Sequence, residues 1–368
     1  MDLADFSNSY GAFYAPTFQV KVGGQSLTHA LGVAVTQVEI DLALGAAGRF
    51  SFTCVDTFDD KQHAFVTTYG KPVLELLKFG APVEVAVGYG DFSGLPTLIT
   101  GAITEISTSF AEGGSPELNV AGYDGLFPMS LGKQSRSWKN ITDSGVISKL
   151  ADEYGLDPGD VQTTDEQHAQ IEQNQESDLE LMKKLAERNH FEFYVSTPNI
   201  LNFAEPNDGG DAVVDLLWGR TLLSFRPEAN LAAQVSQVEV YGWDPNQKTP
   251  IVGKAKAGDE TGRDPRRQSG GERVQTIAKK PSVLQVRQPV FTTAEAERRA
   301  KAILTEHAKK FLTGEAESIG LPDLQPDRNI NLGNLGDPFS KTYYIQQTTH
   351  KLDSNGYRTR VKVKETTL

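Results

Sequence analysis

Several features that are common in secreted proteins and membrane proteins are scarce in this sequence. Cys54 is the only cysteine among 368 residues, so no disulfide can form within the chain and no site with several cysteine ligands exists. The first residues, MDLADFSNSYGAFYAPTF, lack a basic start followed by an apolar run, which predicts synthesis in the cytoplasm without a signal peptide. No stretch of about eighteen consecutive apolar residues occurs, so we expect no membrane insertion.

Positive charge is also in short supply. The chain has 36 Lys and Arg against 48 Asp and Glu, a formal net charge of −12, which argues against specific nucleic acid binding through phosphate contacts. The one basic cluster, Arg263 to Arg273, is interrupted by Asp264 and Glu272. A solvated loop is the favoured interpretation of such a short run of mixed charge, and contact with a polyanion is the alternative.

The sequence contains no recognisable catalytic motif. G-x-S-x-G, H-E-x-x-H, the P-loop and the dinucleotide fingerprint are all missing. The histidines are scattered, and no two have the spacing of metal ligands: His29, His63, His168, His190, His307 and His350. We therefore predict that the protein is not an enzyme and holds no cofactor and no metal.

Two groups of side chains keep an enzymatic alternative open. Cys54 lies near His63, but it alternates with Phe52 in a predicted strand, which favours a packing role over a thiol nucleophile. Carboxylates are abundant, so a cell-wall hydrolase with paired acids is the enzyme alternative. On one predicted helix, Asp178 and Glu187 lie opposite the apolar face, and we expect both to be ordinary solvent residues.

The first third of the chain alternates with the period of β-strands. Phe50, Phe52 and Cys54 illustrate the pattern after Gly48, and similar alternation recurs from Pro16 to about Pro128. About six short antiparallel strands with one buried face predict a sandwich or a small barrel.

The middle of the chain carries helix signals. Thr142 or Asp143 can cap a helix that Gly155 ends, and Ser177 with Glu180 forms a capping box for a second helix. After Asn189 the period changes from helix to strand. These patterns predict a small insert of helices and strands.

Strand patterns return in the last third of the chain. The segments Gln234 to Tyr241, Tyr343 to Thr348 and Tyr357 to Val363 are the clearest, and Thr292 with Glu295 forms a capping box for one intervening helix. The region around Asn246 to Lys280 is rich in Lys, Arg, Gly and Asp, which predicts a mobile linker.

The predicted fold class is α+β and mainly β, with two related β-barrel domains and a small helical insert between them. Val35 to Ile40 resembles Val235 to Val240, a weak sign of duplication. The predicted boundaries are an N-terminal arm at 1–15, a first barrel at 16–130, an insert at 131–205 and a second barrel at 206–368 that contains the mobile linker 246–285.

Three segments occur together in an order typical of one family. They are Ala169 to Val195, with a Glu-Ser-Asp-Leu start to its helix; Val238 to Pro245; and the stretch from Gly320 through Tyr343 to Thr359. In this order they resemble the phage late control gene D proteins, the central hub of contractile tails, and the N-terminal hub part of the type VI secretion spike VgrG.

The resemblance implies a fold and a set of partners. It implies two related tube-type β-barrels and a homotrimer, in which three chains make a pseudo-hexameric ring that joins a six-fold inner tube protein to a three-fold spike. The chain ends at Leu368, before the needle domains of VgrG, so we expect a separate spike protein. Other baseplate components and assembly into a phage tail or an extracellular injection particle are also implied.

The resemblance also implies which strands flank the ring. The candidate strand residues for contacts between subunits or with the tube are Val35, Gln37, Glu39, Val235, Gln237 and Glu239. Three acidic copies would further suggest a channel that repels DNA or acidic cargo.

An aromatic arm precedes the first strand. Phe6, Tyr10, Phe13 and Tyr14 are too apolar for a solvated tail, and we expect them to dock on a neighbouring subunit rather than fold back on their own barrel. Besides the hub, two alternatives remain: a tail-associated peptidoglycan hydrolase, and a peripheral receptor-binding or carbohydrate-binding tail protein.

Overall fold

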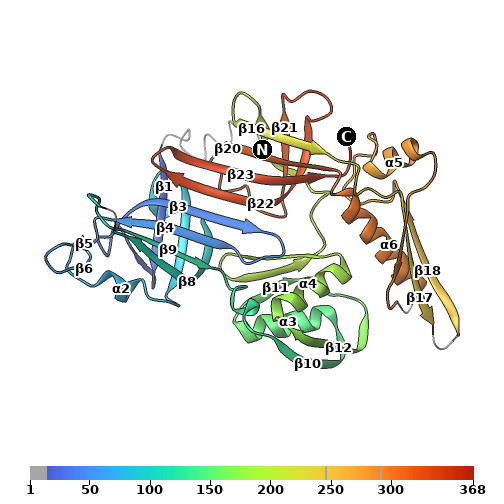
Figure 1. Ribbon diagram of the computed structural model, residues 1–368, viewed down its shortest axis with the longest axis horizontal. Coiled ribbons are helices and arrows are strands. Elements are labelled where there is room, and N and C mark those ends of the chain that lie inside the picture. The colour runs from blue at the N-terminus through green and yellow to red at the C-terminus, as the bar shows by residue number, and fades with distance from the viewer. Residues whose placement is uncertain (1–14, 111, 245–246, 291) are drawn as a thin grey trace.

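A 13-stranded sheet forms the body of the protein (Figure 1). The computed structural model describes residues 15–110, 112–244, 247–290 and 292–368. The sheet runs in the order β16-β20-β23-β22-β3-β4-β9-β8-β7-β1-β2, with β21 on β22 and β15 on β21. The mainly β fold class predicted from the sequence is therefore confirmed.

The N-terminal part of the sheet follows the alternation in the sequence. Phe50, Phe52 and Cys54 of β4 are buried, and burial raises the pKa of the Cys54 thiol to about 12, as suits a packed residue. The strands of this part are β1 (Pro16–Val22), β2 (Gln25–Ser26), β3 (Ala34–Ala43), β4 (Arg49–Val55), β7 (Pro82–Tyr89), β8 (Thr97–Ser109) and β9 (Glu117–Tyr123). A small extension carries β5 (Phe58–Asp59), β6 (Ala64–Phe65) and α2 (Val73–Leu76).

The C-terminal strands join this part through one long strand. The first part of β22 pairs with β21 over 341–344, and its second part pairs with β3 over 347–352, after a register shift between Ile345 and Gln347. The strands of this region are β15 (Ala212–Leu217), β16 (Leu222–Ala229), β20 (Leu312–Ile319), β21 (Asn329–Gly333), β22 (Lys341–Asp353) and β23 (Gly356–Glu365).

Each region has its own apolar core inside this continuous sheet. Val38, Phe50 and Val85 belong to the first core, and Leu216 and Tyr343 belong to the second. The division into two related barrels remains a prediction, because the hydrogen-bonded sheet runs through both regions without a break.

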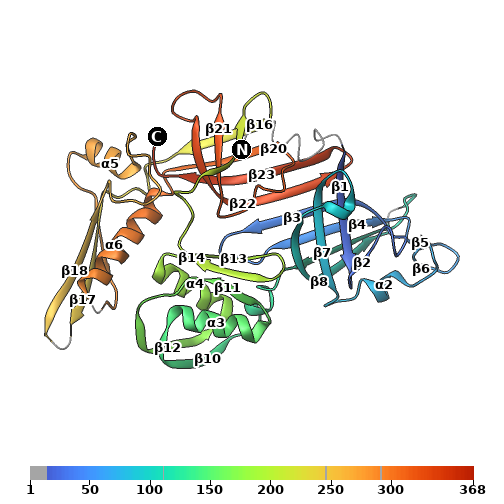
Figure 2. The ribbon, with the colours of Figure 1, turned by 180° about the vertical axis from the view of Figure 1, so that it is seen from behind.

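The insert lies beside the central sheet in both views (Figures 1 and 2). Its predicted helix caps form: the Thr142 hydroxyl accepts from the Gly145 N–H, and Ser177 and Glu180 make both bonds of a capping box. Leu150 and Met182 are fully buried in a separate core. The elements are β10 (Gln134–Thr142), α3 (Asp143–Tyr154), β11 (Asp157–Val161), β12 (Gln167–Glu176), α4 (Asp178–Asn189), β13 (Glu192–Ser196) and β14 (Ile200–Ala204).

The predicted mobile linker is corrected by the structure, because most of its described part forms regular elements. A capping box at Ser269 and Glu272 starts α5, and Ile251 and Ala255 of β18 pack into a small core under α6. Small apolar residues separated by lysines hid this strand from the sequence reading. The unit comprises β17 (Gln237–Asp244), β18 (Thr249–Lys256), α5 (Gly270–Ala278), β19 (Val283–Arg287) and α6 (Thr293–Ala308).

Only half of the capping box predicted for α6 is present. The Thr292 hydroxyl accepts from the Glu295 N–H, but the Glu295 carboxylate pairs with Arg299 at 2.6 Å. The expected docking arm, Phe6, Tyr10, Phe13 and Tyr14, lies outside the described residues. Among the described residues, the helices are too short or too polar to cross a bilayer.

Candidate assembly surface

On five neighbouring strands of the central sheet, one side faces the cores and the other side is polar and at least partly exposed. Residues that alternate with buried ones on five neighbouring strands form this second side. We call it the polar face, and it consists of Glu315 and Glu317 of β20, Arg358, Arg360 and Lys362 of β23, Thr349 and Lys351 of β22, Gln37, Glu39 and Asp41 of β3, and Arg49, Ser51 and Thr53 of β4.

Cross-strand contacts organise the charges on this face. Glu317 pairs with Arg358 at 2.8 Å and with Arg360 at 3.2 Å. The hydrogen bond from Arg358 is the main reason that the pKa of Glu317 lies below its usual value. The Thr349 hydroxyl donates to Asp41 at 2.6 Å, which ties β22 to β3 across a sequence separation of 308 residues.

The polar face carries both signs of charge in columns. Arg358 and Arg360 lie on β23, between two groups of acidic side chains. Glu317 lies on the neighbouring strand β20, and Glu39 and Asp41 lie on β3, beyond β22. A hollow of about 330 Å³ opens on the face beside these side chains. The face therefore carries closely paired charges of both signs rather than a field of one sign.

The candidate residues of β3 occupy two sides of the sheet. Gln37 and Glu39 lie on the polar face, next to Thr53 and Ser51 of β4. Val35 instead packs against the first core, because the register shifts between Val35 and Gln37. The structure thus places two of the three predicted residues where they can meet a partner.

The second group of candidate residues lies in a different sheet. Gln237 and Glu239 belong to β17, while Val235 precedes this strand and packs against the core under α6. The Glu239 carboxylate accepts from Gln237, Tyr241 and Gln285 at 2.9, 2.7 and 3.2 Å. The pKa of Glu239 is lowered to about 2, mainly by the hydrogen bond from Lys254, whose Nζ lies 2.8 Å from the carboxylate.

The similar segments Val35 to Ile40 and Val235 to Val240 are therefore not equivalent in space. β3 lies in the middle of the 13-stranded sheet, and β17 is the middle strand of a separate three-stranded sheet. The six candidate residues do not come together in one chain.

Sequence reasoning missed the most prominent row of the polar face. Arg358, Arg360 and Lys362 alternate with buried Thr359 and Val361 on β23. This alternation is visible in the sequence, but it does not reveal that acidic residues from β20 and β3 lie on either side.

The residues considered for catalysis occupy structural positions. His350 is buried, with its ring nitrogens bonded to the Tyr357 hydroxyl at 2.8 Å and to the Leu324 carbonyl at 2.9 Å, and burial lowers its pKa to about 4. Glu187 is exposed as expected. The prediction that Asp178 is a solvent residue is wrong, because its side chain is buried (3% exposed) and lies in a hydrogen-bond network.

The described residues contain no group of three or more His, Cys, Asp or Glu side chains that could hold a metal ion. The chemistry that the polar face offers is ion pairing and hydrogen bonding, among its own side chains and with water.

The fold is shared with tail proteins of known structure. The 43 kDa tail protein of prophage MuSo2 from Shewanella oneidensis is 17% identical, with a TM-score of 0.69 over 95% of this chain and 98% of that chain. A tail protein from Neisseria meningitidis MC58 is 16% identical, with a TM-score of 0.67 over 96% and 97%.

A third similar structure is the E. coli c3393 protein, a component of the type VI secretion system with structural similarity to the T4 tail proteins gp27 and gp5. It is 12% identical, with a TM-score of 0.59 over 94% of this chain and 76% of that chain. The resemblance to tail hub and VgrG proteins is thus confirmed at the level of the fold.

Sequence comparison adds one family. A family described as the Alg8 N-terminal domain matches residues 14–354. No curated protein matches the sequence.

Proposed function

The chain belongs to the family described as the Alg8 N-terminal domain, and from the fold that it shares with tail proteins we propose that it is a structural hub of a baseplate. It acts by assembly in a contractile tail or injection system and not by catalysis. Its partners are further copies of itself, an inner tube protein, a separate spike protein and other baseplate components.

The continuous sheet is the observation that carries this proposal. Because β22 pairs with both β21 and β3, each chain presents two sets of strands as one surface. Three copies around an axis would present six such sets to a six-fold tube while keeping three-fold symmetry toward a spike. This matching of symmetries supports the proposal of a homotrimeric, pseudo-hexameric ring.

The polar face is the side of the sheet that would line the channel of the ring. A channel wall must stay hydrated and must not bind what passes along it, and closely paired charges such as Arg358 with Glu317 suit that role. The wall would be of mixed charge, since the row on β23 is basic while the neighbouring residues of β3 and β20 are acidic. This replaces the uniformly acidic channel suggested by net charge alone.

A sheet edge supplies the means of assembly. β16 ends the strand order, and apart from a bridge between Leu222 and Trp218 its outer side pairs with no strand among the described residues. Pairing between copies would satisfy these backbone groups and close the ring. The insert, with its separate core, would remain on the outside, available to baseplate components.

The oligomeric state is the first test. Light scattering of the purified chain, alone and with its spike protein, followed by negative-stain imaging, should show a trimeric ring with a central channel. A monomer under both conditions would refute the hub.

Labelling of single cysteines tests the orientation of the sheet. In a Cys54→Val background, Lys362→Cys places a thiol on the polar face, and Glu187→Cys places a control thiol on the exposed side of α4. A bulky maleimide should modify the control in the assembled particle and should leave the channel position unmodified. Equal labelling of both positions in the particle would contradict the proposed orientation.

A further inference from the structure

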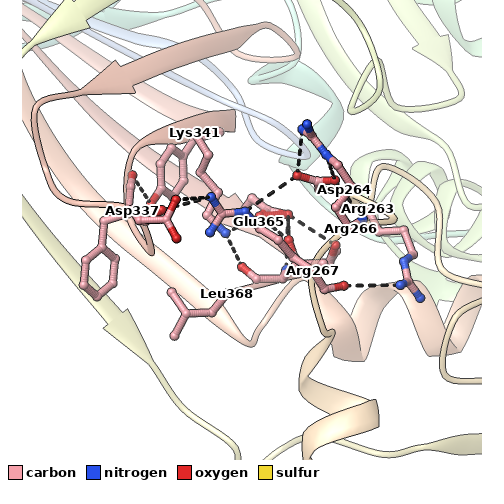
Figure 3. Close-up of polar contacts among 12 residues, drawn as sticks. Arg263, Asp264, Arg266, Arg267, Asp337, Lys341, Glu365 and Leu368 are labelled. Atoms are coloured by element: carbon pink, nitrogen blue, oxygen red, sulfur yellow. Dashed lines mark hydrogen bonds and ion pairs between the residues drawn. The ribbon is translucent and has the colours of Figure 1, made fainter.

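A polar network joins the loop before α5 to the C-terminal strands (Figure 3). Lys341 pairs with Glu365 at 3.1 Å, and the loop residue Arg267 pairs with Asp337 at 3.5 Å. In the loop itself, Arg266 pairs with Asp264 at 3.1 Å. These contacts hold the basic cluster identified in the sequence against the end of the central sheet.

A cavity of about 640 Å³ lies beside this network. Its volume is in the range of sites that bind small molecules. Positive side chains dominate its lining: Arg263, Arg266, Arg267, Lys309, Lys341 and Lys364. The acidic side chains in the lining are Asp208, Asp264 and Glu365, so an excess of positive charge is concentrated here in a chain whose net charge is −12.

The deepest cation is incompletely compensated. Lys309 is 3% exposed, and its Nζ lies 3.1 Å from Asp208 Oδ2. Neither atom makes a hydrogen bond within the described residues, because the pair lacks hydrogen-bond geometry. The Asp208 carboxylate and the Tyr344 ring, whose centroid lies 5.2 Å from Nζ, offset part of the cost of burying this ammonium group, but its protons make no hydrogen bond among the described residues.

A second lysine lies on the cavity wall. Lys364 is partly buried on β23, and no salt bridge or side-chain hydrogen bond of its ammonium group is present among the described residues. Burial lowers its pKa, and Glu306 and Glu192 oppose this effect from the side of the insert and α6. Repulsion from Lys309 lowers the pKa of Lys364 further, so both lysines would attract an anion bound between them.

The loop side of the cavity offers guanidinium groups. Arg266 is 88% exposed at the mouth, and Arg263 Nε is buried without a hydrogen-bond partner in the described structure. Guanidinium groups bind oxyanions through paired N–H groups, and lysines add charge at short range.

We propose that this cavity is a binding site for a small, multiply charged oxyanion group, with Lys309 and Lys364 at its floor and Arg266 at its mouth. The group is either a di- or triphosphate in solution or closely spaced carboxylates on an acidic peptide. This site is independent of the ring proposed above and would function in a single chain. It also gives a role to the basic run that sequence analysis assigned more readily to a solvated loop.

Calorimetric titration of the whole chain tests the site with two probes, sodium pyrophosphate and a hexa-aspartate peptide, in buffers of matched ionic strength. Lys364→Met removes a wall cation, and Arg266→Gln removes a cation whose side chain is 88% exposed. Lys362→Met is the matched control, because it is the same substitution two residues earlier on the same strand, outside the cavity.

We expect at least one probe to bind the wild-type chain and the Lys362→Met control equally. Binding should weaken by about tenfold or more in Lys364→Met and by a smaller factor in Arg266→Gln. Binding of pyrophosphate alone identifies a free phosphate ligand, and binding of the peptide alone identifies an acidic segment. Absence of binding by both probes, or equal weakening in Lys364→Met and Lys362→Met, would overturn the proposal.

Discussion

Replacing Asp178 with alanine should destabilise the insert strongly. Its carboxylate accepts from the Tyr154 hydroxyl and Gln173 Nε2, each at 2.7 Å, and from Arg136 Nη2. Asp178 is 3% exposed, so its removal leaves three donors without their acceptor in a largely dry site. Breaking a buried charged network in this way costs about 3 to 5 kcal/mol, and the lost favourable charge at the start of α4 adds about 0.5 kcal/mol.

The same arginine supplies a matched control. Glu153 pairs with Arg136 at 2.8 Å, but its side chain is 49% exposed. Glu153→Ala should therefore cost less than about 1 kcal/mol, because water screens and replaces an exposed ion pair. Two acids on one guanidinium group thus differ several-fold in effect, because Asp178 is buried and accepts from three donors while Glu153 is exposed and accepts from one.

Urea unfolding followed by far-UV circular dichroism would measure both variants, and hydrogen exchange of α3 and α4 amides would locate the loss. Burial acts to raise the pKa of Asp178, but the hydrogen bonds from Tyr154, Gln173 and Arg136 outweigh it and the pKa is lowered. Its stabilisation is consequently present above about pH 4 and is lost as the pH falls through the folded pKa. Equal, small effects of Asp178→Ala and Glu153→Ala would refute the burial argument.

Three further predictions concern pH and packing. Burial lowers the pKa of His350 to about 4, so stability should fall by up to about 3 kcal/mol between about pH 6.5 and pH 4, and urea titrations should show this slope reduced in His350→Gln. Burial raises the pKa of Glu192 to about 7, so wild-type stability declines as the pH rises through 7. Glu192→Gln should therefore raise the melting temperature at about pH 8 but not at about pH 5. An equal shift of the melting temperature at both pH values would contradict this prediction. A Cβ on Gly253 would lie 2.1 Å from the backbone carbon of Ala296 in α6, so calorimetry should show a loss above about 2 kcal/mol in Gly253→Ala but below about 1 kcal/mol in Gly94→Ala, where nothing lies within 4 Å.

Local features of the protein were predictable from the sequence because they depend on neighbours along the chain. Ser177 and Glu180 are three residues apart, and their capping box forms as expected. The alternation of Phe50, Phe52 and Cys54 specified both a strand and its buried side. Such signals gave the mainly β class, the insert helices and the family resemblance.

Other features depended on residues that are distant in sequence. From the sequence, Asp178 can be placed only on the polar side of a helix. Its burial results from β10, α3 and β12, which supply its hydrogen-bond partners. The composition of β18, with its lysines and small residues, predicts a linker. In the structure α6 packs closely against this strand at Gly253, which makes it part of a core. In both cases packing from other elements overrides the local composition.

The sequence by itself determined which residues alternate, where helices begin and that the chain lacks the usual catalytic motifs. Only the tertiary structure decided that β22 changes partner from β21 to β3, that Gln37 and Glu39 share a face with Arg358 and Arg360, and that Lys309 at the end of α6 meets Lys364 of β23 in one cavity. The physical reason is that strand register and side-chain convergence arise from pairing across hundreds of residues, for which no local pattern carries the information.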